Sequence, residues 1–299
     1  MMGAERCGLV AIIGRPNVGK STLLNHLLGQ KISITSRKPQ TTRHRILGVS
    51  TRDEVQTVYV DTPGLHRVEA RALNRMMNRA ARAAVRDVDV VLMVVERLQW
   101  VEEDEQVLQV LRAAAKPALL IINKIDQIDD KAALLPHIAR LKDLYPFVAI
   151  VPVSALKGSN LAQLEGEVGG LLPEAPHLFP ADQVTDRSER FLVAEIIREK
   201  LIRQLGEELP YANAVQIEEF SQQGGIIHIS GLIIVEKPGQ KAIVIGRGGE
   251  RLKQVGVEAR HDMERLLGSK VMLKLWVKVR SGWADDERAL ASLGYQDDG

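Results

Sequence analysis

The sequence has one cysteine, few aromatic residues and no long hydrophobic run. Cys7 has no second cysteine with which to form an intramolecular disulfide, which fits a reducing compartment. The apolar stretch Gly8–Ile13 is too short for a secretory signal, and no segment approaches the roughly 18 apolar residues of a membrane-spanning helix. Aromatic residues make up 4% of the chain, which argues against a nucleic-acid site built as an aromatic stacking platform. We therefore expect a cytoplasmic protein.

Neither sign of charge dominates the composition. Forty Lys and Arg residues against 38 Asp and Glu residues give a net charge of +2, which excludes a globally basic nucleic-acid coat but not a local basic patch. The hydrophobic fraction of 45% is that of a globular protein, so general disorder is excluded. A length of 299 residues predicts about two domains.

The first half of the chain alternates apolar runs with segments of helical spacing. Runs rich in Val and Ile predict strands that are buried on both faces: Leu9–Ile13, Thr57–Val60, Val88–Val95, Ala118–Ile122 and Val148–Val153. Helical stripes of leucine end at Gly29 and at Pro173. Strands that alternate with helices predict an α/β domain with a doubly wound, mostly parallel sheet.

The second half has a different order of elements. Pro173–Pro180 holds three prolines in eight residues and predicts a linker. Beyond it, the pattern predicts helix, strand, strand, helix, helix and strand, with a turn at Lys237–Gly239 and a short helix in the tail. The clearest segments are Glu189–Leu205, Val215–Phe220, Ile226–Val235, Glu250–Leu267 and Lys270–Arg280. We expect domains at residues 1–172 and 188–299, joined by a linker at 173–187.

A phosphate-binding motif follows the first predicted strand. GRPNVGKS at Gly14–Ser21 matches G-x-x-x-x-G-K-[ST] in full, between a buried strand and a helix. Its glycines let backbone N–H groups surround the phosphates, Lys20 would reach the terminal phosphates, and the Ser21 hydroxyl would bind Mg²⁺. The predicted contacts are Gly14, Arg15, Pro16, Asn17, Val18, Gly19, Lys20, Ser21 and Thr22.

Three further segments follow predicted strands and complete a nucleotide site. In Asp61-Thr62-Pro63-Gly64, the carboxylate can meet Mg²⁺ through water and the Gly64 N–H can sense a γ-phosphate. In Asn123-Lys124-Ile125-Asp126, the Asp carboxylate can accept both the ring N–H and the exocyclic amine of guanine. Adenine has no such pair of donors and would leave a buried carboxylate unpaired. Ser154-Ala155-Leu156 would flank the base, so the sequence predicts a guanine nucleotide.

These motifs, in this order and spacing, resemble the translation-factor-related GTPases, and the whole chain resembles the bacterial Era family. The resemblance covers about Gly8 to Tyr295 and implies a GTPase that uses Mg²⁺. It assigns Gln40–His44 to the switch segment and Thr42 to the threonine that closes on Mg²⁺ and the γ-phosphate. The catalytic residues would then be Lys20, Thr42 and Gly64, and the metal ligands Ser21, Thr42 and Asp61.

The position after Gly64, where many GTPases carry a water-orienting glutamine, holds Leu65. Slow intrinsic turnover is therefore expected. His66 as a base, or an arginine finger from Arg37, Arg43 or Arg45, remain alternatives to an exposed loop without a catalytic role. Two interpretations of Asn17 stay open. Its side chain hydrogen-bonds its own loop, or it binds K⁺, as the equivalent asparagine does in related GTPases.

A glycine loop and a local excess of positive charge mark the C-terminal half. Gly246-Arg247-Gly248-Gly249 lies between two helical segments, as in KH domains, where such a loop lets the backbone approach four nucleotides. From Lys237 to Arg280 there are 11 basic and four acidic residues, a net charge of +7. The predicted order of elements is that of the bacterial KH fold. The predicted RNA contacts are Lys241, Ile245, Gly246, Arg247, Gly248, Gly249, Arg251 and Lys253. Trp276 could stack a base or pack in a core or interface.

The resemblance also implies partners. It predicts binding to the 3′ end of small-subunit ribosomal RNA and to the small ribosomal subunit during its assembly, with RNA affinity set by GTP or GDP. It further implies a peripheral contact with the inner membrane, for which the sequence shows no anchor, and we expect a monomer. Two alternatives stay open from the residues alone: a signalling or cell-cycle GTPase whose basic module binds a protein or membrane partner, and a GTP-dependent RNA-modifying enzyme.

Overall fold

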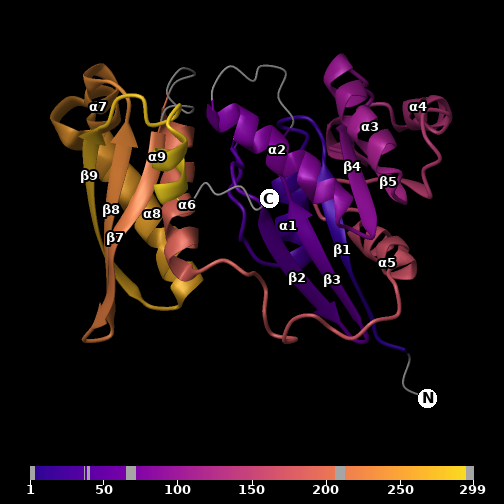
Figure 1. The fold of residues 1–299 in the computed structure, drawn as a ribbon, viewed down its shortest axis with the longest axis horizontal. Coiled ribbons are helices and arrows are strands. Elements are labelled where there is room, and N and C mark those ends of the chain that lie inside the picture. The colour runs from indigo at the N-terminus through magenta and orange to yellow at the C-terminus, as the bar shows by residue number, and fades with distance from the viewer. Residues whose placement is uncertain (1–3, 37, 39–40, 65–71, 206–212, 294–299) are drawn as a thin grey trace.

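The structure is a computed structural model that describes residues 4–36, 38, 41–64, 72–205 and 213–293. Two lobes lie side by side (Figure 1). The chain between α5 (Leu161–Leu171) and α6 (Glu189–Gln204) runs along one edge of the first lobe before it enters the second. No helix among the described residues is long and apolar enough to cross a membrane.

Within the described residues, the first lobe contains a six-stranded sheet in the order β2-β3-β1-β4-β5-β6. All neighbours are parallel except β2 and β3, which are antiparallel. The strands are β1 (Arg6–Ile13), β2 (Ile46–Arg52), β3 (Val55–Asp61), β4 (Val90–Glu96), β5 (Ala118–Asn123) and β6 (Ala149–Pro152). Because parallel strands end at one edge of the sheet, the motifs that follow β1, β3, β5 and β6 converge there.

Helices cover both faces of this sheet. On one face, α1 (Lys20–Leu28) and α5 pack against alternate residues of the central strands. On the other face, the covering helices are α2 (Ala72–Arg86), α3 (Glu102–Ala114) and α4 (Leu134–Leu141). The short 3-10 helices η1 (Ile125–Gln127) and η2 (Lys131–Ala133) join β5 to α4. This two-sided burial is why the central strands are nearly continuous apolar runs.

The second lobe has a three-stranded sheet in the order β7-β8-β9, backed by helices. Its elements are α6, β7 (Asn213–Gln223), β8 (Ile226–Val235), α7 (Pro238–Ile245), η3 (Arg247–Gly249), α8 (Glu250–Leu267), β9 (Lys270–Val279) and α9 (Glu287–Ser292). Strands β8 and β9 are parallel, and α6 and α8 pack on one face of the sheet. This is the predicted helix and strand order of the bacterial KH fold.

Most predicted elements are confirmed, and two differ. The edge strand β2 was not predicted, because its sequence ILGVSTR mixes polar and apolar residues and one end is exposed. The predicted turn at Lys237–Gly239 is instead the start of α7. Pro238 occupies its first turn, where a missing N–H costs nothing, and Gln240 accepts the Lys237 N–H at 3.0 Å.

The two lobes share an apolar cluster. Side chains of α2, including Leu73 and Met77, pack with β8 and with the tail, where Trp283 is fully buried. Ala289 and Leu290 of α9 belong to the same cluster as the α2 side chains. The helix that follows the Asp61–Gly64 segment is thus attached directly to the second lobe.

Candidate functional site

A cavity of about 1010 Å³ opens at the carboxyl edge of the six-stranded sheet. Its lining includes these residues of the sequence motifs: Pro16, Asn17, Gly19, Lys20, Ser21, Thr22, Thr42, Gly64, Asn123, Lys124, Asp126, Ala155 and Leu156. Five segments that are far apart in the sequence therefore meet around one space large enough for a nucleotide.

The phosphate loop has a geometry that requires glycine. Gly19 has φ 101°, and a Cβ there would lie 2.3 Å from Nδ2 of Asn123. That amide donates to the Val18 carbonyl at 2.8 Å, which joins the loop to the end of β5. Any side chain at Gly19 would therefore disturb both the loop and the Asn123 segment.

Lys20 begins α1 and its ammonium lies within the loop. Its Nζ donates to the carbonyls of Gly14 and Arg15, each at 3.0 Å. Burial lowers the pKa of Lys20 to about 8, and Asp61 opposes that effect only in part. A cation that is buried against carbonyls is suited to phosphate oxygens, which would supply the missing negative charge.

Three oxygen-bearing side chains converge below the loop. The Ser21 hydroxyl donates to Oδ2 of Asp61 at 2.8 Å and lies 2.7 Å from Oγ1 of Thr42. Ser33 also donates to Oδ2 of Asp61 at 2.8 Å, and burial raises the pKa of that carboxyl. Hydroxyl and carboxylate oxygens are the donors that Mg²⁺ prefers, so this set fits the cation that accompanies a nucleotide phosphate. The described residues contain no group of three or more His, Cys, Asp or Glu that could hold another metal.

Gly64 lies against the phosphate loop. A Cβ at Gly64 would come within 2.9 Å of the Pro16 backbone nitrogen, so the glycine permits this close approach. Leu65, which stands where many GTPases carry the water-orienting glutamine, lies outside the described residues. So do His66 and Arg37, two of the alternatives considered for catalysis. Arg43 is buried and donates to the Asn213 carbonyl of the second lobe at 2.7 Å, away from the cavity lining.

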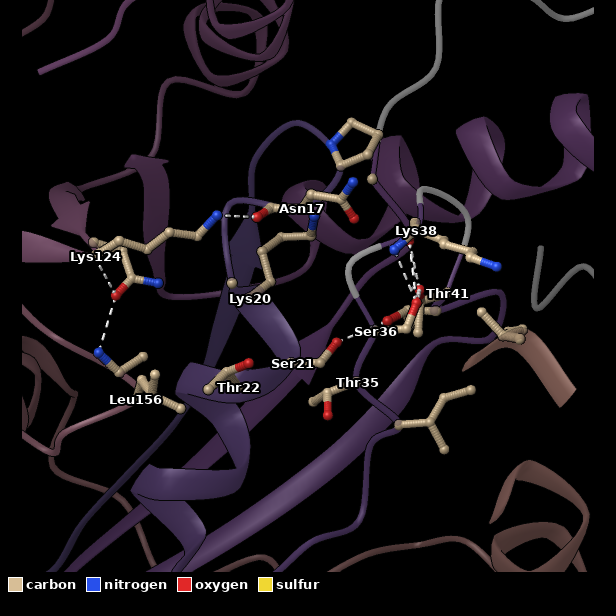
Figure 2. Close-up of a pocket in the computed structure, with 18 of the residues that line it drawn as sticks. Asn17, Lys20, Ser21, Thr22, Thr35, Ser36, Lys38, Thr41, Lys124 and Leu156 are labelled. Atoms are coloured by element: carbon tan, nitrogen blue, oxygen red, sulfur yellow. Dashed lines mark hydrogen bonds between the residues drawn. The ribbon is translucent and has the colours of Figure 1, made fainter. Parts of the chain in front are cut away.

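At the far end of the cavity, side chains converge from β5 and β6. The Asp126 carboxylate accepts the Ser154 hydroxyl at 2.5 Å, and Oδ1 of Asn123 accepts the backbone N–H of Ala155 at 2.9 Å. Lys124 has φ 63°, and its Nζ donates to the Asn17 carbonyl at 2.7 Å (Figure 2). The Asp126 side chain thus lies where it can meet the donor edge of a guanine.

Some predicted contacts do not line the cavity with their side chains. Arg15 turns toward Glu96 and Asp104, while Thr62 donates to the Ile12 carbonyl at 3.0 Å. The remaining members of this group are Gly14, Val18, Asp61, Pro63, Ile125 and Ser154. None of these residues belongs to the cavity lining.

The lining also contains residues that the sequence did not indicate. Ile34, Thr35, Ser36 and Lys38 come from the segment between α1 and β2, and Ile202 and Arg203 come from α6 of the second lobe. No local pattern marks Arg203 as part of a nucleotide cavity, because it lies more than 160 residues from Thr35, whose carbonyl it contacts at 3.1 Å.

Comparisons with known proteins agree with this geometry. Residues 9–124 match the model of a family described as 50S ribosome-binding GTPase, and residues 208–284 match that of the KH domain. The chain is 61% identical to GTPase Era of Ectopseudomonas mendocina, over 98% of both proteins, and 61% identical to GTPase Era of Azotobacter vinelandii, over 98% of this chain and 97% of that one. The chain belongs to the Era family. It is therefore a GTPase.

Two solved structures of the family are similar over nearly the whole chain. They are an Aquifex aeolicus Era variant bound to GDP·AlF4⁻ and Era in complex with MgGDPNP and nucleotides 1506–1542 of 16S ribosomal RNA. Each has a TM-score of 0.94 at 41% identity and covers 97% of this chain and 99% of the other. The Mg²⁺ of the second structure agrees with the oxygen donors around Ser21.

The glycine loop of the KH lobe has backbone conformations that favour glycine. Gly246, Gly248 and Gly249 have φ of 77°, 59° and 81°. A Cβ at Gly246 would come within 2.8 Å of Cβ of Arg251, whereas one at Gly248 or Gly249 meets no described atom within 4 Å. At Gly248 and Gly249, therefore, no described side chain covers the backbone on the side where a ligand could approach.

The predicted cations around this loop differ in their contacts. Arg247 and Lys253 are exposed, and Lys241 is half-buried. Arg251 instead donates to the Ile243 carbonyl at 2.5 Å, which supports the end of α7. Trp276 is 38% exposed on β9, beside the exposed Lys274 and Lys278, so it is not a core residue.

Proposed function

We propose that this GTPase binds the 3′ region of small-subunit ribosomal RNA through its KH lobe and acts in assembly of the small ribosomal subunit, with its RNA affinity set by the bound nucleotide. The observation that carries the proposal is the position of α6. This helix belongs to the KH lobe, yet Ile202 and Arg203 at its end line the nucleotide cavity. The Era structure with MgGDPNP and 16S ribosomal RNA supports the choice of ligand.

The nucleotide and RNA sites are joined through contacts between α6 and the segment that leads to Thr42. Arg198 is 1% exposed, forms an ion pair with Glu195 at 2.6 Å and donates to the Thr41 carbonyl. Glu199 accepts the Thr35 N–H at 3.0 Å. A γ-phosphate that draws Thr42 onto Mg²⁺ would therefore act directly on α6.

A second connection follows the Gly64 side of the cavity. The α2 helix begins soon after Gly64 and buries Leu73 and Met77 against the KH lobe and its tail. Both segments that respond to a γ-phosphate thus end on the KH lobe. By linkage, RNA must favour the GTP form by the factor by which GTP favours RNA binding.

The test is the affinity for a short single-stranded RNA that copies the small-subunit 3′ end, with GDP and with a non-hydrolysable GTP analogue. We expect tighter, sequence-selective binding in the GTP form, weakened by Arg247→Gln with Lys253→Gln. Equal binding of a scrambled RNA, with no dependence on nucleotide or on these cations, would overturn the proposal. The relatives favour this function over the signalling alternative.

We further propose that hydrolysis is stimulated by K⁺ at Asn17. Its side chain is exposed on the cavity lining, at φ 66°, and no described residue hydrogen-bonds its amide. That amide oxygen is free to bind a monovalent cation near the phosphates. Equal hydrolysis rates in KCl and NaCl would overturn this proposal, and Asn17→Ala should abolish any difference between the two salts.

The remaining expectations are also proposals. We infer a monomer in the cytoplasm with a GTPase domain at 1–172, a linker at 173–187 and a KH domain at 188–299. Light scattering tests the monomer, and limited proteolysis tests the boundaries. A peripheral inner-membrane contact predicts that anionic vesicles carry the protein in flotation, and a protein that stays behind would contradict it.

A further inference from the structure

Glu96 is a buried carboxylate beside the nucleotide site that no sequence motif includes. It is the last residue of β4, and its register partner on β5 is Asn123. Its side chain is 11% exposed, although Glu is rarely buried without a partner. A carboxylate in this position must be held by the groups around it.

Each oxygen of Glu96 contacts a different part of the site. Oε1 accepts Nη2 of Arg15, in the phosphate loop, at 2.9 Å. Oε2 accepts Nζ of Lys124, in the guanine-recognition segment. The same Nζ continues to the Asn17 carbonyl of the phosphate loop at 2.7 Å, which Figure 2 shows as a dashed line. Glu96 therefore bridges the two segments that hold opposite ends of a nucleotide.

Asp104, on α3, holds the Arg15 side chain that Glu96 contacts. Nε of Arg15 lies 3.2 Å from Oδ1 of Asp104, a fully buried residue near the start of α3. The other oxygen, Oδ2 of Asp104, accepts the Val101 N–H at 3.1 Å. A third cation, Arg97, lies 3.8 Å from Oε1 of Glu96, so three cations surround the two carboxylates. The neighbouring cations hold the pKa of Glu96 below its usual value despite burial, so this carboxyl is ionised at neutral pH.

We propose that Glu96 is a positioning residue that fixes the guanine-recognition segment relative to the phosphate loop before the nucleotide binds. A guanine nucleotide touches both segments at once, so its affinity depends on their spacing. A ligand that touches only the phosphate loop does not depend on that spacing. Without the carboxylate, Arg15 and Lys124 would repel each other across the gap that Glu96 spans.

The test compares Glu96→Gln with Glu105→Gln as a matched control. Glu105 is on α3, 40% exposed, pairs with Arg112 at 3.1 Å and is not one of the cavity-lining residues. Affinities for fluorescent GDP and, by competition, for inorganic pyrophosphate are measured in both variants. Loss of one hydrogen-bonded charge predicts that GDP binds Glu96→Gln about 10-fold or more weakly, with pyrophosphate changed by less than about 3-fold. The control should change neither.

Steady-state kinetics separates positioning from loss of structure. We expect the KM for GTP to rise in Glu96→Gln while kcat stays within about twofold, because the catalytic residues are untouched. Should Glu96→Gln fail to fold, Glu96→Asp keeps the charge but is one methylene too short to reach both cations, and the same selective loss of GDP affinity is expected. Unchanged GDP affinity, or equal losses for GDP and pyrophosphate, would overturn the proposal.

Discussion

Replacing Glu199 with glutamine tests whether the contact between α6 and the segment before Thr42 transmits the nucleotide state. The Glu199 side chain is fully buried and accepts the Thr35 N–H at 3.0 Å. It also pairs with Lys31 at 2.5 Å and with Arg203 at 2.9 Å. Glutamine keeps an acceptor for Thr35 but removes the charge shared by these two cations and by Lys200, whose Nζ lies 3.6 Å from Oε2.

The structure sets the size of the effect. Lys31 and Arg203 are 41% and 46% exposed, so each loses only about 0.5–1 kcal/mol when its partner becomes neutral. The bond from the Thr35 N–H loses about 1 kcal/mol more as its acceptor changes from charged to neutral. We therefore expect the contact to weaken by about 2 kcal/mol, which is comparable to a typical coupling of about 1–3 kcal/mol between two sites.

The assay is the ratio of RNA affinities in the GTP-analogue and GDP forms. We expect this ratio to fall about 5-fold or more in Glu199→Gln, up to the roughly 30-fold that a loss of about 2 kcal/mol of contact energy allows. Arg112→Gln is the control, because Arg112 is 42% exposed and pairs with Glu105 at 3.1 Å, a salt bridge on α3 that shares no residue with the ion pairs of Glu199. If Glu199→Gln leaves the ratio as in the control, α6 does not transmit the nucleotide state through this residue.

Three further outcomes follow from the geometry. Gly19→Ala should lower GDP affinity more than 10-fold, because Gly19 has φ 101° and the new Cβ would lie 2.3 Å from the Asn123 amide. Gly29 also has a positive φ but has open space around it, so Gly29→Ala should leave GDP affinity unchanged, and equal effects of the two variants would contradict the steric argument. The pKa of Lys20 is about 8, and bound phosphates favour its charged ammonium, so GDP binding should take up protons above that pH. We expect GDP affinity to be level near pH 7 and to fall toward pH 8.5, and calorimetry in two buffers measures the proton uptake. Leu73→Ala should lower the free energy of unfolding by about 2–5 kcal/mol in chemical denaturation, because this side chain is 1% exposed and packs between the lobes. A loss below about 1 kcal/mol would show that the cluster tolerates the cavity that the smaller side chain leaves.

The sequence indicated most of the segments that line the nucleotide cavity, because each motif is contiguous and follows a buried strand. Gly14–Ser21 needs only its own glycines and the start of α1 to form a phosphate loop, and Asn123–Asp126 needs only the end of β5. The parallel sheet then brings these strand ends together. Burial along β9 alternates with a period of two residues, as expected of a strand with one face on the core.

Where prediction fell short, the missing information was long-range. Arg15 belongs to the phosphate motif, but its side chain is drawn away by Glu96 and Asp104, more than 80 residues later. The edge strand β2 carries no clean alternation because it has a single strand neighbour and one exposed end. Neither feature can be read from the residues beside it.

The sequence by itself determined the chemistry of this protein: a guanine nucleotide site, oxygen ligands for Mg²⁺ and a glycine loop in a basic module. These depend on short segments whose spacing is local. Only the tertiary structure decided that α6 of the KH lobe lies on the nucleotide cavity, and that Glu199 meets Thr35 across 164 positions. Periodicity shows that a helix has a buried face, but it carries no information on what that face will meet, because packing partners are chosen by the path of the whole chain.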